Sequence, residues 1–176
     1  MREQTKSEAR VAVLGLGKMG SALASTLLLN ERPLVIWNRS PGKAASLVDS
    51  GATLASSVAD AIEQSELIII CVGNYDHTNE MLTGTEQLWQ GKTLLQLSGG
   101  IAAEARALEH WTKQSKGIYL DGCVLAFPDD VGSPKASLMV TGNTAAWEQY
   151  SELILELGGA STFLGEDVSS HLLIEY

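Results

Sequence analysis

The sequence predicts an α/β domain, a doubly wound fold built on a mostly parallel β-sheet. Two observations along its 176 residues support this prediction. Short apolar runs alternate with longer segments whose apolar residues fall at helical spacing, and a glycine turn joins the first run to the first helical segment. Strands covered on both faces are continuously apolar, and alternating strands and helices form parallel sheets with right-handed crossovers.

The first half of the chain is expected to hold three strands, each followed by at least one helix. Pro33 separates the first helix from the second apolar run. Ser40 and Pro41 are the residue types of a helix N-cap and first turn, and Ser57 opens a further helix. The expected strands are 11–14, 34–37 and 67–72, and the expected helices are 19–30, 41–50, 58–64 and 76–82.

The second half continues the alternation without a repeat, a low-complexity segment or a linker. The strands are expected at 93–97, 118–125, 137–140 and 161–164, and the helices at 102–114 and 145–157. We therefore expect one domain over residues 1–165, with 166–176 as the beginning of another element.

Composition narrows the class of partner. The chain has 21 acidic and 12 basic residues, a formal charge of −9, and its Lys and Arg are scattered. Such a balance argues against nucleic acid and against an anionic membrane surface. The longest apolar run is far shorter than the roughly 20 residues that span a bilayer, and residues 1–10 are polar. We expect a cytoplasmic protein.

A glycine motif of the form G-x-G-x-x-G follows the first strand and opens the first helix, which is the arrangement of a Rossmann-type dinucleotide site. The first glycine permits the tight turn, the second lets a pyrophosphate approach the backbone, and the third allows close packing of helix and strand. Helical N–H groups then face the anion. The predicted contacts are Gly15, Leu16, Gly17, Lys18, Met19 and Gly20.

The residues after the second strand favour NADP(H) as the cofactor. NAD-binding domains usually carry Asp or Glu at this position to meet the adenosine ribose. Here the residue is Asn38, which is neutral, and Arg39 and Ser40 follow it. A guanidinium and a hydroxyl suit a 2′-phosphate, whereas an acid would repel it.

The nicotinamide half of the cofactor is expected at the loops that follow the strands 67–72 and 93–97, because ligands lie beyond the carboxyl ends of the strands. His77 follows the first of these loops and is interpreted as a solvated helical residue. No metal-binding or hydrolase motif occurs, so no metal site is expected. The predicted contacts in the loops are Cys71, Val72, Gly73, Asn74, Ser98 and Gly99.

Seven motifs together resemble those of the imine reductases, relatives of the β-hydroxyacid dehydrogenases. The resemblance covers nearly the whole chain, and its most specific part is the combination of WNRS, VGNY and YLDG…FP. One departure lies after the strand 93–97, where Gly99, Ile101 and Ala102 replace the Ser, Thr and Pro of the family's segment. The motifs are GLGKMG at 15–20, WNRS at 37–40, VGNY at 72–75, QLSGGIAAEAR at 96–106, YLDGCVLAFP at 119–128, VGSP at 131–134 and LGED at 164–167.

The resemblance implies an NADPH-dependent oxidoreductase that transfers hydride to a small cyclic imine or carbonyl analogue. Such enzymes continue into a long interdomain helix and a helical domain, and we expect 166–176 to be the start of that helix. The family's proton donor falls early on this helix, which implies Glu175 as the catalytic residue. The apolar stretch 171–174 would offer a surface for a homodimer. The alternative is a stand-alone NADP(H)-binding module without turnover.

Overall fold

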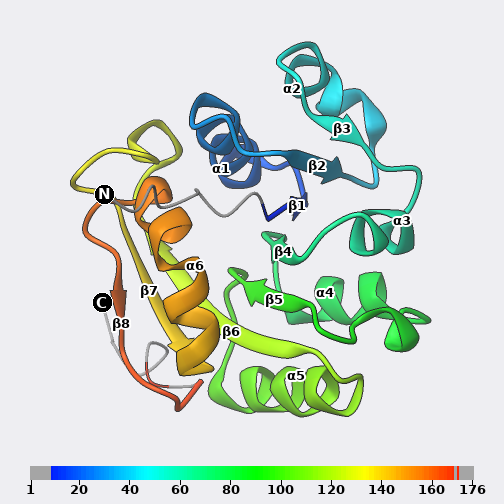
Figure 1. Ribbon diagram of the computed structural model, residues 1–176, viewed down its shortest axis with the longest axis vertical. Coiled ribbons are helices and arrows are strands. Elements are labelled where there is room, and N and C mark those ends of the chain that lie inside the picture. Colours follow the sequence, from blue (N-terminus) through cyan, green and yellow to red (C-terminus); the bar gives the residue numbers. More distant parts are fainter. Residues whose placement is uncertain (1–8, 169, 171–176) are drawn as a thin grey trace, which may run out of the picture.

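An eight-stranded sheet forms the centre of the part of the chain that the computed structural model describes, residues 9–168 and 170 (Figure 1). Its strand order is β3-β2-β1-β4-β5-β6-β7-β8, and every neighbouring pair is parallel except β6 and β7. The predicted doubly wound, mostly parallel α/β fold is confirmed. The strands are β1 (Val11–Leu14), β2 (Leu34–Trp37), β3 (Thr53–Leu54), β4 (Leu67–Ile70), β5 (Thr93–Gln96), β6 (Ile118–Leu125), β7 (Ser137–Gly142) and β8 (Thr162–Phe163).

Helices cover both faces of this sheet, and the alternation of side chains along each strand decides which face each residue serves. Along β1, Val11 and Val13 pack with α1, α2 and α6, whereas Ala12 and Leu14 pack with α3, α4 and α5. The helices are α1 (Lys18–Leu29), α2 (Ala45–Asp49), α3 (Val58–Glu63), α4 (Tyr75–Leu82), α5 (Ala102–Gln114) and α6 (Thr144–Leu157), with 3₁₀ turns η1 (Pro41–Ala44), η2 (Glu86–Leu88) and η3 (Pro128–Asp130).

Several local expectations were wrong. The segment 41–50 is a 3₁₀ turn followed by the short helix α2, and the Ser40 side chain makes no capping hydrogen bond. The two-residue strand β3 is solvent-exposed, so it lacks the apolar run by which the other strands were recognised. The apolar run 67–72 forms a strand only to Ile70, and its last two residues belong to a loop.

The end of the described chain remains packed against the domain. Val168 is 2% exposed and belongs to the core on the α3–α5 face of the sheet. The Glu166 carboxylate accepts a hydrogen bond from the Thr144 hydroxyl at the start of α6. Residues 166–176 were expected to begin the interdomain helix, but residues 166–168 form a bend and a turn and no α-helix; the apolar stretch 171–174 and Glu175 lie outside the described residues.

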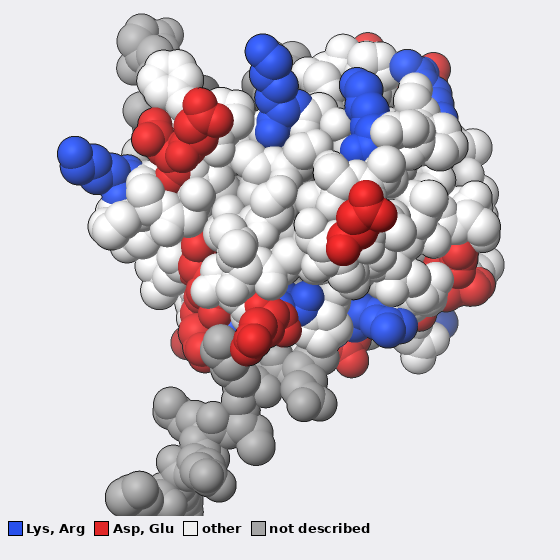
Figure 2. Space-filling view, turned by 90° about the horizontal axis from the view of Figure 1, so that it is seen from above, with Lys and Arg blue, Asp and Glu red and all other residues white. Residues whose placement is uncertain are grey.

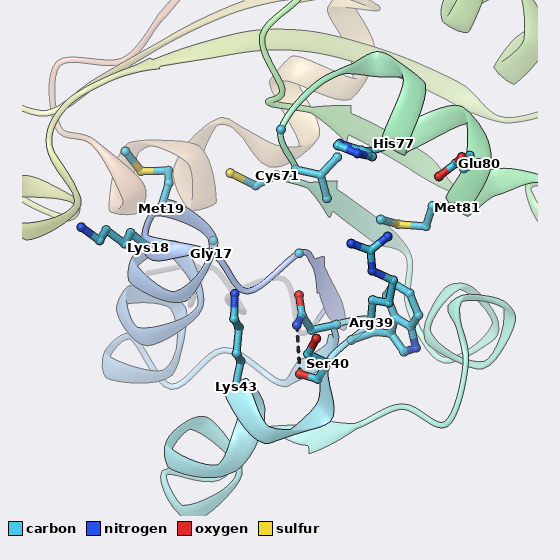
Figure 3. Close-up of a pocket in the computed structure, with 16 residues that line it drawn as sticks. Gly17, Lys18, Met19, Arg39, Ser40, Lys43, Cys71, His77, Glu80 and Met81 are labelled. Atoms are coloured by element: carbon cyan, nitrogen blue, oxygen red, sulfur yellow. Dashed lines mark hydrogen bonds between the residues drawn. The ribbon is translucent and has the colours of Figure 1, made fainter.

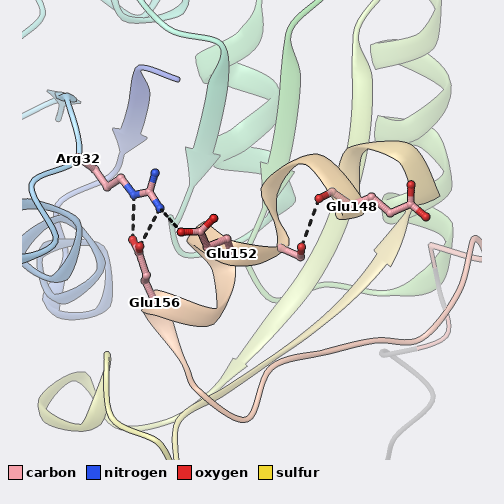
Figure 4. Close-up of polar contacts among 5 residues, drawn as sticks. Arg32, Glu148, Glu152 and Glu156 are labelled. Carbon is pink, nitrogen blue, oxygen red and sulfur yellow. Dashed lines mark hydrogen bonds and ion pairs between the residues drawn. The ribbon is translucent and has the colours of Figure 1, made fainter. Parts of the chain in front are cut away.

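An ion pair fastens α6 to the amino end of β2 (Figure 4). The guanidinium of Arg32, only 5% exposed, donates to both carboxylate oxygens of Glu156, with N–O distances of 2.9 and 2.7 Å. Glu152 lies farther out, 3.8 Å from the same guanidinium. The hydrogen bonds to Glu156 raise the pKa of Arg32 further, so the pair stays charged. It lies at the end of the sheet opposite the loops described next.

Candidate cofactor site

The glycine turn between β1 and α1 has the geometry that each of its three glycines was expected to provide. Gly15 has a φ of +99°, and a Cβ there would collide with the carbonyl oxygen of Cys71. A Cβ on Gly20 would collide with the carbonyl oxygen of Gly15. At Gly17, by contrast, a Cβ would meet nothing within 4 Å. The turn therefore packs tightly against its own domain at two positions and faces open space at the third.

That open space is a pocket of about 620 Å³ beyond the carboxyl ends of β1, β2 and β4. The strand order reverses between β1 and β4, and the point of reversal is where doubly wound sheets bind their ligands. Most predicted contacts line this pocket: Gly15, Gly17, Lys18, Met19, Gly20, Asn38, Arg39, Ser40, Cys71, Val72 and Gly73.

The amide of Asn38 holds the end of β2 against the glycine turn. Its Oδ1 accepts the backbone N–H of Leu16 at 2.9 Å, and its Nδ2 donates to the carbonyl oxygen of Ser40 at 3.0 Å (Figure 3). Leu16 itself is 2% exposed and does not line the pocket. Asn38 thus fixes where the exposed side chains of Arg39 and Ser40 begin, a structural role that the sequence alone did not indicate.

Basic residues line the pocket from two elements. Arg39 and Lys43 belong to the segment after β2, and Lys18 begins α1, with its side chain directed away from the other two (Figure 3). Lys43 was not predicted, although its place in the turn that Pro41 opens was a usable signal. On the face shown in Figure 2, basic side chains stand apart from one another, interspersed with acidic side chains.

One face of α4 forms the opposite wall of the pocket. His77, Glu80 and Met81 line it at helical spacing, while Tyr75, Thr78 and Leu82 on the other side of the helix are buried (Figure 3). The sequence interpretation of His77 as merely solvated missed its place in this wall. The helical period of the buried residues was the signal that could have found it. Trp37, at the end of β2, is a further lining residue that was not predicted.

Cys71 lines the pocket as a largely buried thiol. Burial raises the pKa of Cys71 to about 11, so the group stays protonated at neutral pH and cannot serve as a nucleophile there. Cys71 instead helps to shape the glycine turn. A Cβ on Gly15 would collide with the carbonyl oxygen of Cys71 and with the side chain of Val72.

Besides Leu16, three predicted contacts do not line the pocket. The Ser98 hydroxyl is buried and accepts the backbone N–H of Val72 at 3.0 Å. The Asn74 side chain caps α4 by accepting the N–H of His77 at 3.0 Å. Gly99 is exposed in the loop after β5, and a Cβ there would meet nothing within 4 Å. The first two hold the loop that follows β4.

The described residues fit a dinucleotide better than a metal ion. Gly17 leaves free the space in front of the α1 N-terminus that a pyrophosphate requires, and the basic residues Arg39 and Lys43 line the same pocket. Among residues 9–168 and 170, no group of three or more His, Cys, Asp or Glu side chains could hold a metal ion. Within the same residues no helix is long and apolar enough to cross a membrane.

Comparison with known proteins agrees with this geometry. Residues 10–165 match the family model described as the NAD binding domain of 6-phosphogluconate dehydrogenase. An NADPH-dependent reductive aminase of Aspergillus oryzae (strain ATCC 42149 / RIB 40) is 35% identical over 160 residues, 91% of this chain and 54% of the relative.

Two solved structures have the same fold. An imine reductase from Myxococcus stipitatus in complex with NADP+ superposes with a TM-score of 0.89 at 36% identity, over 92% of this chain and 57% of the other. A reductive aminase from Aspergillus terreus, in complex with NADPH and ethyl-5-oxohexanoate, gives 0.89 at 31% identity, over 93% and 57%. The chain therefore spans a little more than half the length of these relatives.

Proposed function

The chain belongs to the family of the NAD binding domain of 6-phosphogluconate dehydrogenase, and from this premise we propose that it is the NADP(H)-binding domain of an imine reductase-type oxidoreductase. The observation that carries the proposal is the set of residues that line the pocket beyond β2. Arg39 and Lys43 lie there, and the residue at the end of β2 is an amide instead of a carboxylate.

The end of β2 favours the 2′-phosphate of NADP(H) over the free hydroxyl of NAD(H). A carboxylate at this position would accept hydrogen bonds from the ribose hydroxyls and repel a phosphate. The Asn38 side chain is an uncharged amide and so supplies no negative charge. Its hydrogen bonds go to the backbone of Leu16 and of Ser40. Arg39 offers a planar, permanently charged donor group, and Lys43 offers a second cation from the following turn.

The remaining parts of the pocket accommodate the rest of a dinucleotide. The N–H groups in the first turn of α1 lack partners within the helix and suit the pyrophosphate. The loops that follow β4 and β5 leave room for the nicotinamide, at the edge where Gly73 and Gly99 are exposed. NADPH supplies the hydride when it is bound, and the protein's task is to bind it, orient it and limit access of water.

The proposed reaction is hydride transfer to a small imine or its carbonyl analogue, in a protein that extends beyond the described residues. The named relatives, a reductive aminase and an imine reductase, support this reaction class. We further propose that residues 1–165 are the cofactor domain, that 166–176 begin the interdomain helix, and that the enzyme is a cytoplasmic homodimer in which Glu175 donates the proton.

Calorimetric titration with 2′,5′-ADP and 5′-AMP tests the cofactor assignment. The two ligands differ by one phosphate, so the ratio of their Kd values isolates the 2′-phosphate contact. Losing a charge-assisted hydrogen bond costs about 1.5 to 3 kcal/mol, so Arg39→Ala should weaken 2′,5′-ADP roughly ten- to hundredfold and leave 5′-AMP unchanged. Lys113→Ala, on the exposed side of α5, is the control for loss of one positive charge. Equal affinities for the two ligands in the parent protein contradict the assignment.

Oxidation of NADPH in the presence of a cyclic imine tests the reductase assignment. Protein-dependent loss of the reduced nicotinamide absorbance, abolished by Gly17→Val, supports it. Binding of NADPH without any protein-dependent oxidation favours the alternative, an NADP(H)-binding module without turnover.

A further inference from the structure

A buried cluster of two tyrosines and an aspartate lies behind the pocket, between the sheet and helices α4 and α5. Asp121 on β6 is 0% exposed, and its Oδ2 accepts hydrogen bonds from the hydroxyls of Tyr75 at 2.5 Å and Tyr119 at 2.6 Å. Tyr75 and Tyr119 are themselves 0% and 2% exposed. A carboxyl group is costly to bury without partners, and these two hydroxyls provide them.

The tyrosines act as hydrogen-bond donors and not as acids at ordinary pH. Burial, with a further contribution from the charge of Asp121, raises the pKa of Tyr75 and of Tyr119 well above the usual value. Both hydroxyls therefore keep their protons. None of the three residues lines the cofactor pocket, so the cluster acts through what it holds in place.

Tyr75 connects the first turn of α4 to the loop that follows β5. A Cβ on Gly100 would collide with the ring of Tyr75, which shows that the ring packs directly against the backbone of this loop. A second link joins the same two regions, because the Ser98 hydroxyl accepts the N–H of Val72. The loops after β4 and β5 are thus tied together at two points beside the pocket.

The rest of α4 has an anchor of its own. The Gln96 side chain on β5 donates to the Thr78 hydroxyl at 2.9 Å, and both residues are buried. The side chain of Asn74 caps the helix. His77 and Met81, which form the α4 wall of the pocket, are therefore held in place without the Tyr75 hydroxyl.

We propose that Tyr75, held by Asp121, is a positioning residue that fixes the loop 98–100 beside the loop after β4 and so shapes the nicotinamide end of the site. This inference rests on the proposed NADP(H) function. The phosphate-binding end is built from β2, η1 and α1, whereas the residues of the cluster belong to α4 and β6. Loss of the Tyr75–Asp121 hydrogen bond should consequently weaken binding of the nicotinamide half of the cofactor and leave binding of the adenosine phosphate half unchanged.

The test compares two matched variants, Tyr75→Phe and Tyr150→Phe. Each removes one hydroxyl from a buried tyrosine; Tyr150 lies on α6 near Thr93, at the amino end of β5 and far from the pocket. Calorimetry gives the Kd of NADPH and of 2′,5′-ADP, and a thermal melt gives Tm. We expect Tyr75→Phe to raise the Kd of NADPH about fivefold, the effect of one hydrogen bond, and to change that of 2′,5′-ADP by less than about twofold. Tyr150→Phe should lower Tm and change neither Kd.

Two results overturn the positioning role: no change in either Kd for Tyr75→Phe, or an equal rise in both. Should Tyr75→Phe fail to fold, Tyr119→Phe removes the other hydroxyl from Asp121 and is subjected to the same comparison. If the parent protein binds neither NADPH nor 2′,5′-ADP, the proposed function is refuted, and the inference with it. Normal binding by the parent and by Tyr75→Phe refutes the inference alone.

Discussion

Valine at position 17 should separate cofactor binding from folding. Gly17 has φ −70° and ψ −174°, which any residue adopts, and a Cβ there meets nothing within 4 Å of the protein. Gly17→Val therefore costs only the difference between glycine and valine as the N-cap of α1, about 1 kcal/mol in the free energy of unfolding. In the matched variant Gly20→Val, the new side chain collides with the Gly15 carbonyl, and we expect a loss of about 3 kcal/mol or more.

Gly17→Val should weaken NADPH binding strongly, although it changes the free energy of unfolding only slightly. The valine methyl groups would occupy the space before the α1 N-terminus, where a pyrophosphate would accept backbone N–H groups. Losing two charge-assisted hydrogen bonds costs about 3 to 6 kcal/mol, a roughly hundred- to ten-thousandfold rise in the Kd of NADPH. Urea denaturation measures the first quantity and calorimetry the second. Parent-like NADPH affinity in a folded Gly17→Val protein would refute the reasoning.

Two further predictions concern stability and thiol reactivity. Arg32→Met removes the guanidinium that pairs with the Glu156 carboxylate, whose side chain is 15% exposed, and should lower the free energy of unfolding by about 3 kcal/mol without changing the Kd of NADPH. Adding Glu156→Gln should recover most of this loss, and a single-variant loss below about 1 kcal/mol in urea denaturation would contradict the prediction. Because the pKa of Cys71 is about 11, iodoacetamide should modify it roughly a hundredfold more slowly at pH 8 than an ordinary cysteine. The rate of modification should rise as the pH approaches 11, and it should fall when NADPH is added. Peptide mass spectrometry follows this site separately from Cys123, and modification at pH 8 as fast as that of a free cysteine would be inconsistent with a buried, protonated thiol.

The sequence predicted the fold where a single property determines the structure. Strands buried on both faces, such as Val11–Leu14 and Leu67–Ile70, are continuously apolar, and the glycine turn follows the first of them directly. β3 escaped prediction because it consists of two exposed residues held by pairing with β2. The antiparallel pairing of β6 and β7 depends on how the chain turns between them, which residue patterns do not record.

Within the site, the sequence located the residues whose backbone forms the pocket, such as the glycine turn. It did not locate the residues that contacts between distant segments bring to the pocket. The role of Asn38 depends on a hydrogen bond to Leu16, 22 positions away in the chain. The α4 wall depends on which side of the helix faces the sheet, and that is decided by Tyr75 and Thr78 reaching Asp121 and Gln96. Such contacts join residues far apart in sequence, so local patterns do not reveal the contacts themselves, although the helical period of Tyr75, Thr78 and Leu82 indicates which side of α4 faces the sheet.

The central claim, that the pocket is a site for NADP(H), is tested most directly by calorimetric titration of the unmodified protein with NADPH and with NADH. The two cofactors differ only in the 2′-phosphate, for which we propose Arg39 and Lys43, two lining residues of the pocket, as the contacts. We predict that NADPH binds at least about tenfold more tightly, the worth of one charge-assisted hydrogen bond. Equal affinities, or tighter binding of NADH, would contradict the claim.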